Sequence, residues 1–209
     1  MPRKAEPKKT AAKKVDVAEK VLETAMKLAA EGHWRDLSLA EIADAAKLSL
    51  AKVYPVYSSK QAILSALFRR IDAAVMEAED AAAREGPARD RLFDVMMRRF
   101  DALGPYREAM ANIIGAQVRD PLAAACGLAR LGRSMACMLE AAGFSTSGLR
   151  GALRIKGLSA AYLATLRVWL SDESPDMAPT MAALDRHLGR LDNLAKCLSR
   201  LQNQRPKFA

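Results

Sequence analysis

The chain has 209 residues, of which 51% are hydrophobic and 5% aromatic, enough for one large domain or two small ones with a real apolar core. Basic residues outnumber acidic residues by 33 to 24, and the formal net charge of +9 suits a polyanionic partner, either nucleic acid or an anionic membrane. No run of about 18 uncharged apolar residues occurs and no apolar run follows the basic N-terminus, which argues against a transmembrane helix and a secretory signal.

The N-terminal residues 1–14 carry six basic side chains against one acidic side chain, and they predict a disordered basic arm. An ordinary solvated tail is the alternative interpretation. A first helix is expected from about Asp16, because apolar residues recur on one of its faces. Gly32 supplies the left-handed residue that ends this helix, and Trp34 is expected to pack against the apolar face.

Serines mark the next three helix starts. Ser38 with Glu41, and Ser58 with Gln61, both fit the capping box, in which the serine hydroxyl accepts from a first-turn amide and the longer side chain reaches back to the serine amide. Ser49 lies between them as a third N-cap candidate. The sequence therefore predicts helices that begin at Ser38, at Ser49 and near Ser58.

Residues 38–57 form a unit of two short helices. The first covers 38–46, a turn of about three residues follows, and the second covers 49–54 and ends before Pro55. A helix of barely two turns is stable only when the surrounding structure holds it. This layout predicts a helix-turn-helix whose second helix is presented to the major groove of DNA. An ordinary helical corner is the alternative.

The rest of the chain reads as helix with breaks at glycine and proline. The sequence shows no internal repeat and no strand alternation, so the predicted fold class is all-α with about nine helices. The expected helices after the helix-turn-helix are 58–85, 88–103, 106–120, 121–143, 147–170 and 180–201.

The stretch SLAEIADAAKLSLAKVYPVYSSKQAIL, residues 38–64, resembles the DNA-binding signature of TetR-type transcriptional regulators. The resemblance covers about residues 15–75 and rests on Ile42, Ala43, Ser49, Tyr54, Tyr57 and Lys60. It implies a homodimer that binds a palindromic operator in double-stranded DNA, usually as a repressor released by a small ligand. The residues expected to contact DNA are Ser38, Ser49, Leu50, Ala51, Lys52, Tyr54, Tyr57 and Lys60.

The expected organisation follows from this resemblance. It comprises an arm over 1–14, a DNA-binding domain over 15–75, a regulatory and dimerisation domain over 76–201, and a tail over 202–209. Residues 1–70 hold 14 basic and 8 acidic residues, so most of the positive surplus lies where DNA is expected.

The recognition helix departs from the family pattern by being poor in hydrogen-bonding groups. Lys47 stands where the family often has a turn glycine, and Leu50 stands where a polar reader is usual. Base identity is read mainly by donors and acceptors in the major groove, although Leu50 and Ala51 could contact thymine methyl groups. Either the basic arm adds affinity through phosphates or the minor groove, or the scaffold has lost its DNA role.

The last helix carries a 4-3-4-3 stripe that is typical of a helix–helix interface. In the resembling family the last two long helices commonly form a four-helix bundle across the dimer axis, so this stripe is assigned to dimerisation. The alternative is that it covers the domain's own core. The residues of the stripe are Leu184, Leu188, Leu191, Ala195 and Leu198.

Methionines and aromatic residues on the central helices suit either an adaptable apolar ligand pocket or ordinary core packing. The candidate lining residues are Met96, Phe100, Met110, Ile113, Met135, Met138, Tyr162, Leu166 and Trp169. No ligand is named. The segment VWLSDESPDMAPTMAALDRHL, residues 168–188, is also similar to lipid-binding accessory proteins of ubiquinone biosynthesis, which share the TetR scaffold. A lipid-binding protein without sequence-specific DNA binding is therefore the alternative function.

The sequence offers little for catalysis. Its two histidines, His33 and His187, are far apart, and no metal spacing, nucleophile elbow, Walker loop or dinucleotide glycine motif occurs. We expect no enzyme activity, no cofactor and no metal. Three cysteines without a C-x-x-C pair favour a reducing, cytoplasmic location.

Overall fold

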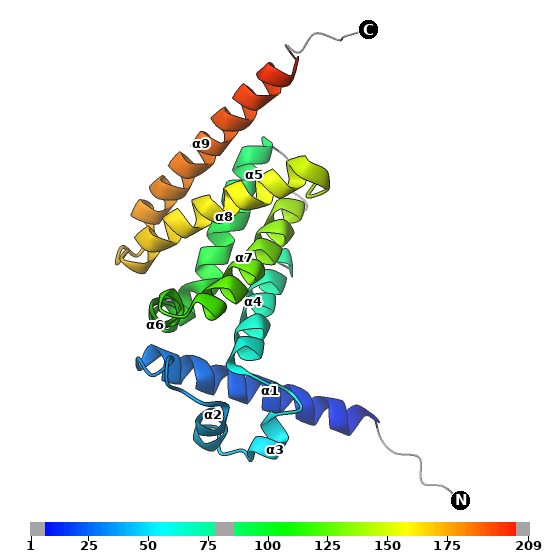
Figure 1. Cartoon of the computed structure of the whole chain (residues 1–209), viewed down its shortest axis with the longest axis vertical. Helices are drawn as coiled ribbons and strands as arrows, with labels where there is room; N and C mark the ends of the chain where they lie inside the picture. The colour runs from blue at the N-terminus through cyan, green and yellow to red at the C-terminus, as the bar shows by residue number, and fades with distance from the viewer. Residues whose placement is uncertain (1–6, 78–85, 204–209) are drawn as a thin grey trace, which may run out of the picture. The chain divides into compact units, whose positions relative to one another are not determined.

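The computed structural model describes residues 7–77 and 86–203, and within these ranges every regular element is helical (Figure 1). This confirms the all-α expectation. The described elements are α1 (Pro7–Ala30), α2 (Leu39–Ala45), α3 (Leu50–Val53), α4 (Lys60–Glu77), α5 (Ala88–Leu103), the 3₁₀ turn η2 (Gly104–Tyr106), α6 (Arg107–Val118), α7 (Pro121–Ala141), α8 (Gly148–Leu170) and α9 (Ala178–Asn203).

The first helix begins earlier than the sequence indicated. It starts at Pro7 rather than near Asp16, so residues 7–14 of the predicted arm are helical. Proline suits the first position of a helix, and the alanines and lysines that follow are strong helix formers, so the local propensity favours the helix despite the charge density. The remaining arm residues 1–6 lie outside the described residues, as do residues 78–85 of the predicted fourth helix.

The chain divides into two compact units whose boundaries differ from the expected ones. Unit 1 comprises residues 1–70 and 104–128, and unit 2 comprises residues 71–103 and 129–209. Helix α6 therefore packs with the N-terminal helices rather than with the C-terminal domain. The Asn112 amide explains part of this, because it donates to the carbonyl oxygens of Ala29 and Ala30, at 3.0 Å each, and so caps the end of α1.

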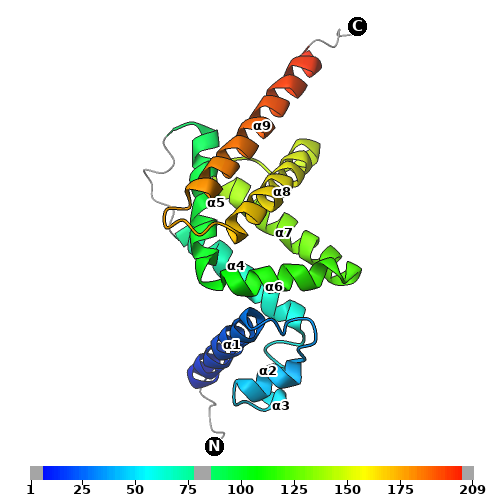
Figure 2. The ribbon, with the colours of Figure 1, turned by 90° about the vertical axis from the view of Figure 1, so that its left-hand side faces the viewer.

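In unit 1, helix α1 lies between α6 on one side and the α2–α3 pair on the other (Figure 2). Trp34 is buried as expected, and Gly32 ends α1 with a φ of 94°. An ion pair between helices adds to the packing, because the Arg70 guanidinium donates to Glu19 and Glu23 of α1 at 2.8 Å each. These side chains are about half exposed, so the pairs contribute little to stability.

Unit 2 is built around a buried group of aromatic and charged side chains. Phe100 stacks on Tyr162 with the ring centroids 5.3 Å apart, and Trp169 tilts against the same phenylalanine at 5.7 Å. The fully buried Arg99 is paired with Asp72, whose carboxylate also accepts from the Ser134 hydroxyl. Helices α8 and α9 lie side by side in this unit (Figure 1).

Candidate nucleic-acid interface

The capping box predicted at the start of α2 is present. The Glu41 amide donates to the Ser38 Oγ at 3.1 Å, and the Ser38 amide donates to the Glu41 carboxylate at 2.7 Å. Hydrogen bonds from the Ser38 side chain and backbone lower the pKa of the Glu41 carboxyl. The box fixes the point at which the chain enters α2, and Ile42 and Ala43 then bury the inner face of that helix.

The turn between α2 and α3 contains a lysine in the left-handed region. Lys47 has a φ of 56°. Its amide donates to the Asp44 carbonyl and the Leu48 amide donates to the Ala43 carbonyl, both at 2.9 Å, which is the Schellman pattern. Glycine is the usual residue at this position because a side chain is strained there. The helix-turn-helix therefore keeps its turn geometry without the usual glycine.

Helix α3 is anchored through a buried residue on one face and is exposed to solvent on the other. Val53 is fully buried, whereas Leu50 is 43% exposed and Tyr54 is 60% exposed. Ala51 and Lys52 are exposed as well. Ser49 is the N-cap, as predicted, with an extended backbone, but its hydroxyl makes no capping hydrogen bond. Residues 49–52 and Tyr54 thus form an exposed face, which we call the α3 face.

Two of the predicted DNA contacts are engaged with the rest of unit 1, Tyr57 by burial and Lys60 by hydrogen bonds to the backbone. Tyr57 is 7% exposed, and burial raises the pKa of its hydroxyl. The Lys60 ammonium donates to the carbonyl oxygens of Trp34 at 2.9 Å and Arg35 at 3.1 Å, and it lies 5.4 Å from the centre of the Trp34 ring. For Tyr57 the expectation of a DNA contact is corrected, because it is a core residue. Lys60 anchors the loop between α1 and α2, and its contact with DNA stays a prediction.

The cap of α4 also lies one residue later than predicted. The Ala62 amide donates to the Ser59 Oγ at 3.2 Å, so Ser59 rather than Ser58 caps this helix. The two serines are adjacent and both suit the cap, so the sequence alone did not separate them. The shift places Lys60 in the first turn of α4, from which its long side chain reaches back to the loop before α2.

The predicted ligand pocket is divided between the two units. Met110 and Ile113 lie in unit 1, and the other seven predicted lining residues lie in unit 2. All nine are buried, and the aromatic ones stack on each other as described above. The seven side chains of unit 2 are packed as a core, which is the alternative that the sequence left open.

The predicted dimer stripe on α9 is only partly exposed. Leu184 and Leu188 are buried within unit 2, and Leu191 is half-buried with its side chain against Gly157 of α8. Ala195 is exposed, and the Leu198 side chain lies outside the described side chains. For Leu184 and Leu188 the dimer assignment is corrected, because the α9 stripe covers the core of its own unit against α8 and α5.

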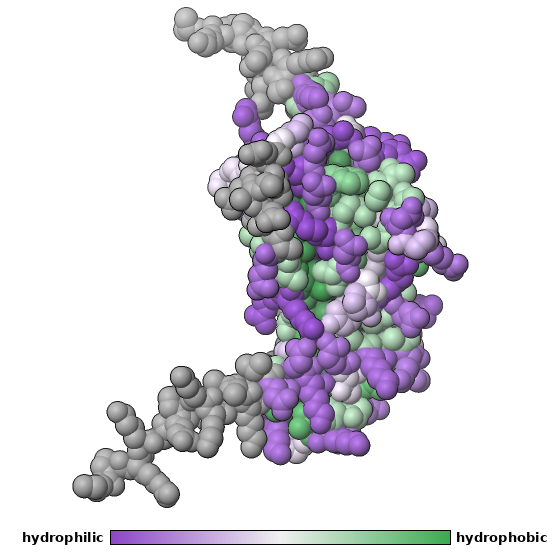
Figure 3. Space-filling view, turned by 180° about the vertical axis from the view of Figure 1, so that it is seen from behind, coloured by the Kyte–Doolittle hydropathy of each residue, from purple (hydrophilic) through white to green (hydrophobic). Residues whose placement is uncertain are grey.

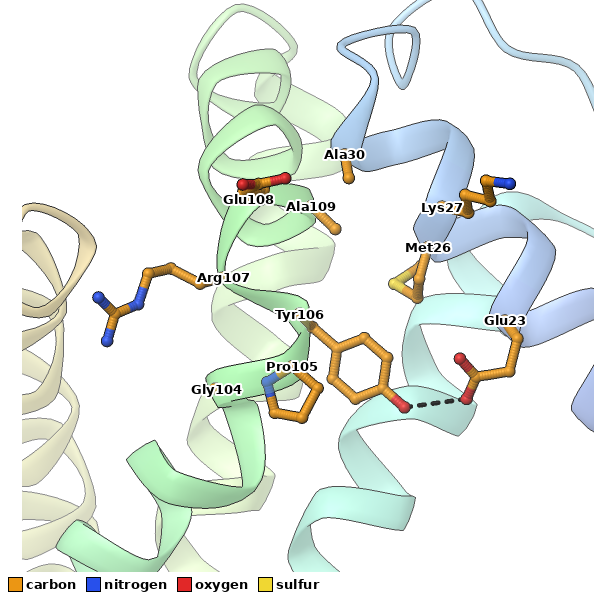
Figure 4. A pocket seen from close by; sticks show the side chains of 10 residues that line it. All are labelled: Glu23, Met26, Lys27, Ala30, Gly104, Pro105, Tyr106, Arg107, Glu108 and Ala109. Atoms are coloured by element: carbon orange, nitrogen blue, oxygen red, sulfur yellow. Dashed lines mark hydrogen bonds between the residues drawn. The ribbon is translucent and has the colours of Figure 1, made fainter. Parts of the chain in front are cut away.

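A cavity of about 540 Å³ lies in unit 1, at a place that the sequence did not indicate (Figure 4). In Figure 4 the Tyr106 hydroxyl points across it and donates to the Glu23 carboxylate of α1 at 3.0 Å. Burial and this hydrogen bond raise the pKa of Tyr106. The lining residues are Glu23, Met26, Lys27, Ala30, Gly104, Pro105, Tyr106, Arg107, Glu108 and Ala109, none of which belongs to the predicted pocket.

The described residues also bear on the metal and membrane expectations. Among them, no group of three or more histidine, cysteine or acidic side chains is placed to hold a metal ion. One described helix, α7, is long and apolar enough to cross a membrane by length and composition alone. In this helix 28% of the apolar window is buried, and Arg130, Ser134 and Met135 are among its buried residues.

The comparisons with known proteins find similarity at the helix-turn-helix and in the overall helical fold. Residues 21–67 match the family of bacterial regulatory proteins called the tetR family. A TetR transcriptional regulator from Nitrosomonas europaea ATCC 19718 superposes with a TM-score of 0.67 at 26% identity, over 83% of this chain and 96% of that chain. A TetR transcriptional regulator from Rhodococcus sp. RHA1 gives a TM-score of 0.61 at 16% identity, over 84% and 96%. A comparison with curated proteins gives no match.

Proposed function

We propose that this chain, which has a TetR-type helix-turn-helix and the fold of TetR transcriptional regulators, is a ligand-responsive dimeric repressor that binds a palindromic operator. One observation carries the DNA assignment: α3 is fixed to unit 1 through Val53 and presents the α3 face outward. Such a helix is what enters the major groove in helix-turn-helix proteins. A DNA-binding regulator of this kind acts in the cytoplasm, in agreement with the location that the cysteines favour.

Capture of genomic DNA tests the operator. Purified protein is mixed with sheared genomic fragments at two salt concentrations, and the bound DNA is sequenced. We expect an enriched palindrome whose half-site centres lie about 34–36 Å apart, with affinity that falls steeply as salt rises. Enrichment of no sequence at either salt concentration would contradict the proposal.

A matched pair of lysine variants separates base contact from structural anchoring. Lys52→Ala removes an exposed cation of the α3 face, and we expect it to change the preferred bases and to reduce the salt slope. Lys60→Ala removes the loop anchor, so we expect weaker binding with an unchanged salt slope. A reduced slope in the Lys60→Ala variant would restore the phosphate role that the sequence suggested.

The dimer contact is proposed on the outer side of α8 rather than on the predicted α9 stripe. Leu149, Leu153 and Leu163 are exposed along α8 at spacings that share a face, and Leu194 is exposed on α9. The two helices of each protomer would then form a four-helix bundle with their counterparts. Leu153→Glu is expected to give a monomer by light scattering, whereas Arg133→Glu, at an exposed position on α7, serves as the charge control.

One observation favours the lipid-binding alternative. Val118, Leu122 and Leu128 are exposed around the α6–α7 corner of unit 1, and Figure 3 shows hydrophobic side chains among hydrophilic ones on one face of the molecule. Native mass spectrometry of the freshly purified protein addresses both functions. A co-purified isoprenoid or phospholipid, together with no enriched DNA sequence, would favour the alternative. A small molecule whose removal changes operator affinity would support the ligand-responsive repressor.

A further inference from the structure

The α3 face has an unusual chemical make-up for a surface that reads bases. From Ala46 to Ser58 the sequence contains no arginine, asparagine or glutamine. These are the side chains that make paired hydrogen bonds to guanine and adenine in the major groove. Two neighbouring polar side chains are otherwise engaged: Tyr57 is buried, and the Lys60 ammonium donates to the carbonyl oxygens of Trp34 and Arg35.

What the α3 face offers instead is apolar surface at the first turn of the helix. Leu50 is 43% exposed, and Ala51 beside it is exposed too. The first residues of a recognition helix are the ones that contact base edges in helix-turn-helix proteins. Thymine is the base that presents an apolar group in the major groove, its C5-methyl.

We propose that Leu50, assisted by Ala51, selects thymine by contact with its C5-methyl group, so that each operator half-site has thymine beneath the first turn of α3. This inference rests on the proposed function. The exposed Lys47 and Lys52 flank the apolar pair in the sequence, and unit 1 as a whole has a positive net charge. Attraction between these basic side chains and the DNA phosphates would therefore bring Leu50 and Ala51 to the major groove. Lys52 and Tyr54 supply the remaining polar contacts.

Deoxyuridine tests the inference, because it lacks the C5-methyl of thymine and keeps the same pairing and the same O4 acceptor. Once an operator has been captured, duplexes are made in which single thymines are replaced by deoxyuridine, and binding is measured by fluorescence anisotropy at one salt concentration. One buried methyl is worth a factor of about four in affinity. Replacement at the equivalent position of both half-sites is therefore expected to weaken binding about 10- to 20-fold.

A double-mutant cycle assigns the methyl contact to a residue. Leu50→Ala is expected to weaken binding to the thymine operator and to make the protein nearly indifferent to the same deoxyuridine replacement. Lys52→Ala is the matched control, since it should weaken binding and change the preference at other bases while the preference for thymine over deoxyuridine remains. Circular dichroism checks that both exposed-site variants keep the helical fold.

The outcomes separate this inference from the proposed function. If an operator is captured and no deoxyuridine replacement changes affinity, the methyl contact is wrong and the repressor proposal stands. If the sensitivity to deoxyuridine persists in Leu50→Ala, the methyl is not read by Leu50 and the inference is overturned. If no operator is captured, it is the proposed function that fails, because the deoxyuridine experiment then has no substrate.

Discussion

The helix-turn-helix of unit 1 and the core of unit 2 place their polar side chains in opposite ways. Residues 38–57 keep Ser49, Lys52 and Tyr54 outside and bury a few small apolar side chains beneath them. Unit 2 instead buries a cation: Arg99 is fully buried and is paired with Asp72. A charge in that position requires its partner, because an unpaired buried ion is costly.

The difference predicts where each unit is sensitive. The short helix α3 has an exposed outer face, so its stability depends on its end caps and on a single buried residue. Each of these contributes on the order of 1–2 kcal/mol to the free energy of unfolding. A core with a buried cation depends on one contact whose loss costs more, because removal of the carboxylate leaves the buried charge uncompensated.

Removal of Asp72 is expected to have the largest effect. Asp72→Ala leaves the Arg99 guanidinium without its carboxylate and the Ser134 hydroxyl without its acceptor, so the free energy of unfolding should fall by about 3–5 kcal/mol. Urea unfolding at a fixed protein concentration measures it. Asp101→Ala, an exposed carboxylate on the neighbouring α5, is the control and should change stability by less than about 0.5 kcal/mol. A loss of stability in Asp72→Ala as small as that in Asp101→Ala would show that the ion pair is dispensable.

Substitutions at two positions on α3 should separate its contribution to folding stability from its contribution to DNA binding. Val53→Ala removes two methyl groups from a fully buried side chain, and we expect the free energy of unfolding to fall by about 2 kcal/mol. Leu50→Ala changes an exposed side chain, so stability should stay within about 0.5 kcal/mol while DNA affinity falls. Thermal and urea unfolding without DNA, followed by anisotropy with the operator, measure the two effects. A large stability loss in Leu50→Ala would place that side chain in the core.

Local sequence signals predicted the helix-turn-helix well, because its determinants are local. The box of Ser38 with Glu41, the stop at Gly32 and the break at Pro55 involve residues within four positions of each other or a single residue type. The resemblance to TetR regulators then implies a DNA-binding function for a motif whose geometry these local signals already indicate. The predicted start of α1 is wrong because the helix propensity of alanine and lysine outweighs the repulsion within the dense charge run.

Side chains whose role depends on tertiary contacts were harder to predict. Lys60 reaches carbonyls 25 and 26 residues earlier in the chain, and Arg99 meets Asp72 from 27 residues away. No periodic pattern in the sequence predicts these long-range contacts. The α9 stripe shows the same limit, since its 4-3-4-3 pattern correctly indicated a buried face but did not tell which helix covers Leu184 and Leu188. An apolar repeat in the sequence indicates that a helix face is buried, but only the folded structure shows which helix packs against it.

Two serines at helix starts allow a smaller test of the caps. Ser38→Ala removes the hydroxyl that the Glu41 amide uses, and we expect a loss of about 1 kcal/mol in the free energy of unfolding. Ser49→Ala should lose less, because the Ser49 hydroxyl makes no capping bond. Urea unfolding at pH 7 measures both. Similar losses at the two serines would show that the Ser49 hydroxyl caps α3 after all.

The same box predicts a pH dependence. The pKa of Glu41 is lowered in the folded protein, so its ionised form stabilises the fold above the unfolded value of 4.5, and this contribution is lost as the pH falls through the lower folded pKa. The stability difference between the protein and Glu41→Gln should therefore shrink as the pH falls from 5 towards 3. A difference that stays constant over this range would show that the Glu41 charge does not contribute.

Lys47→Gly is the smallest expected effect and the only one of opposite sign. A side chain in the left-handed region costs about 1–2 kcal/mol, while glycine costs about 0.5–1 kcal/mol through the entropy of the unfolded chain. The strain is the larger quantity, so the variant should be more stable by about 0.5–1 kcal/mol in urea unfolding. Lys52→Gly is the matched control, because it places the same residue in the helical geometry of α3 and should destabilise by a similar amount. If Lys47→Gly also destabilises, the turn is not strained, and the lysine at this position then contributes packing that outweighs its backbone geometry.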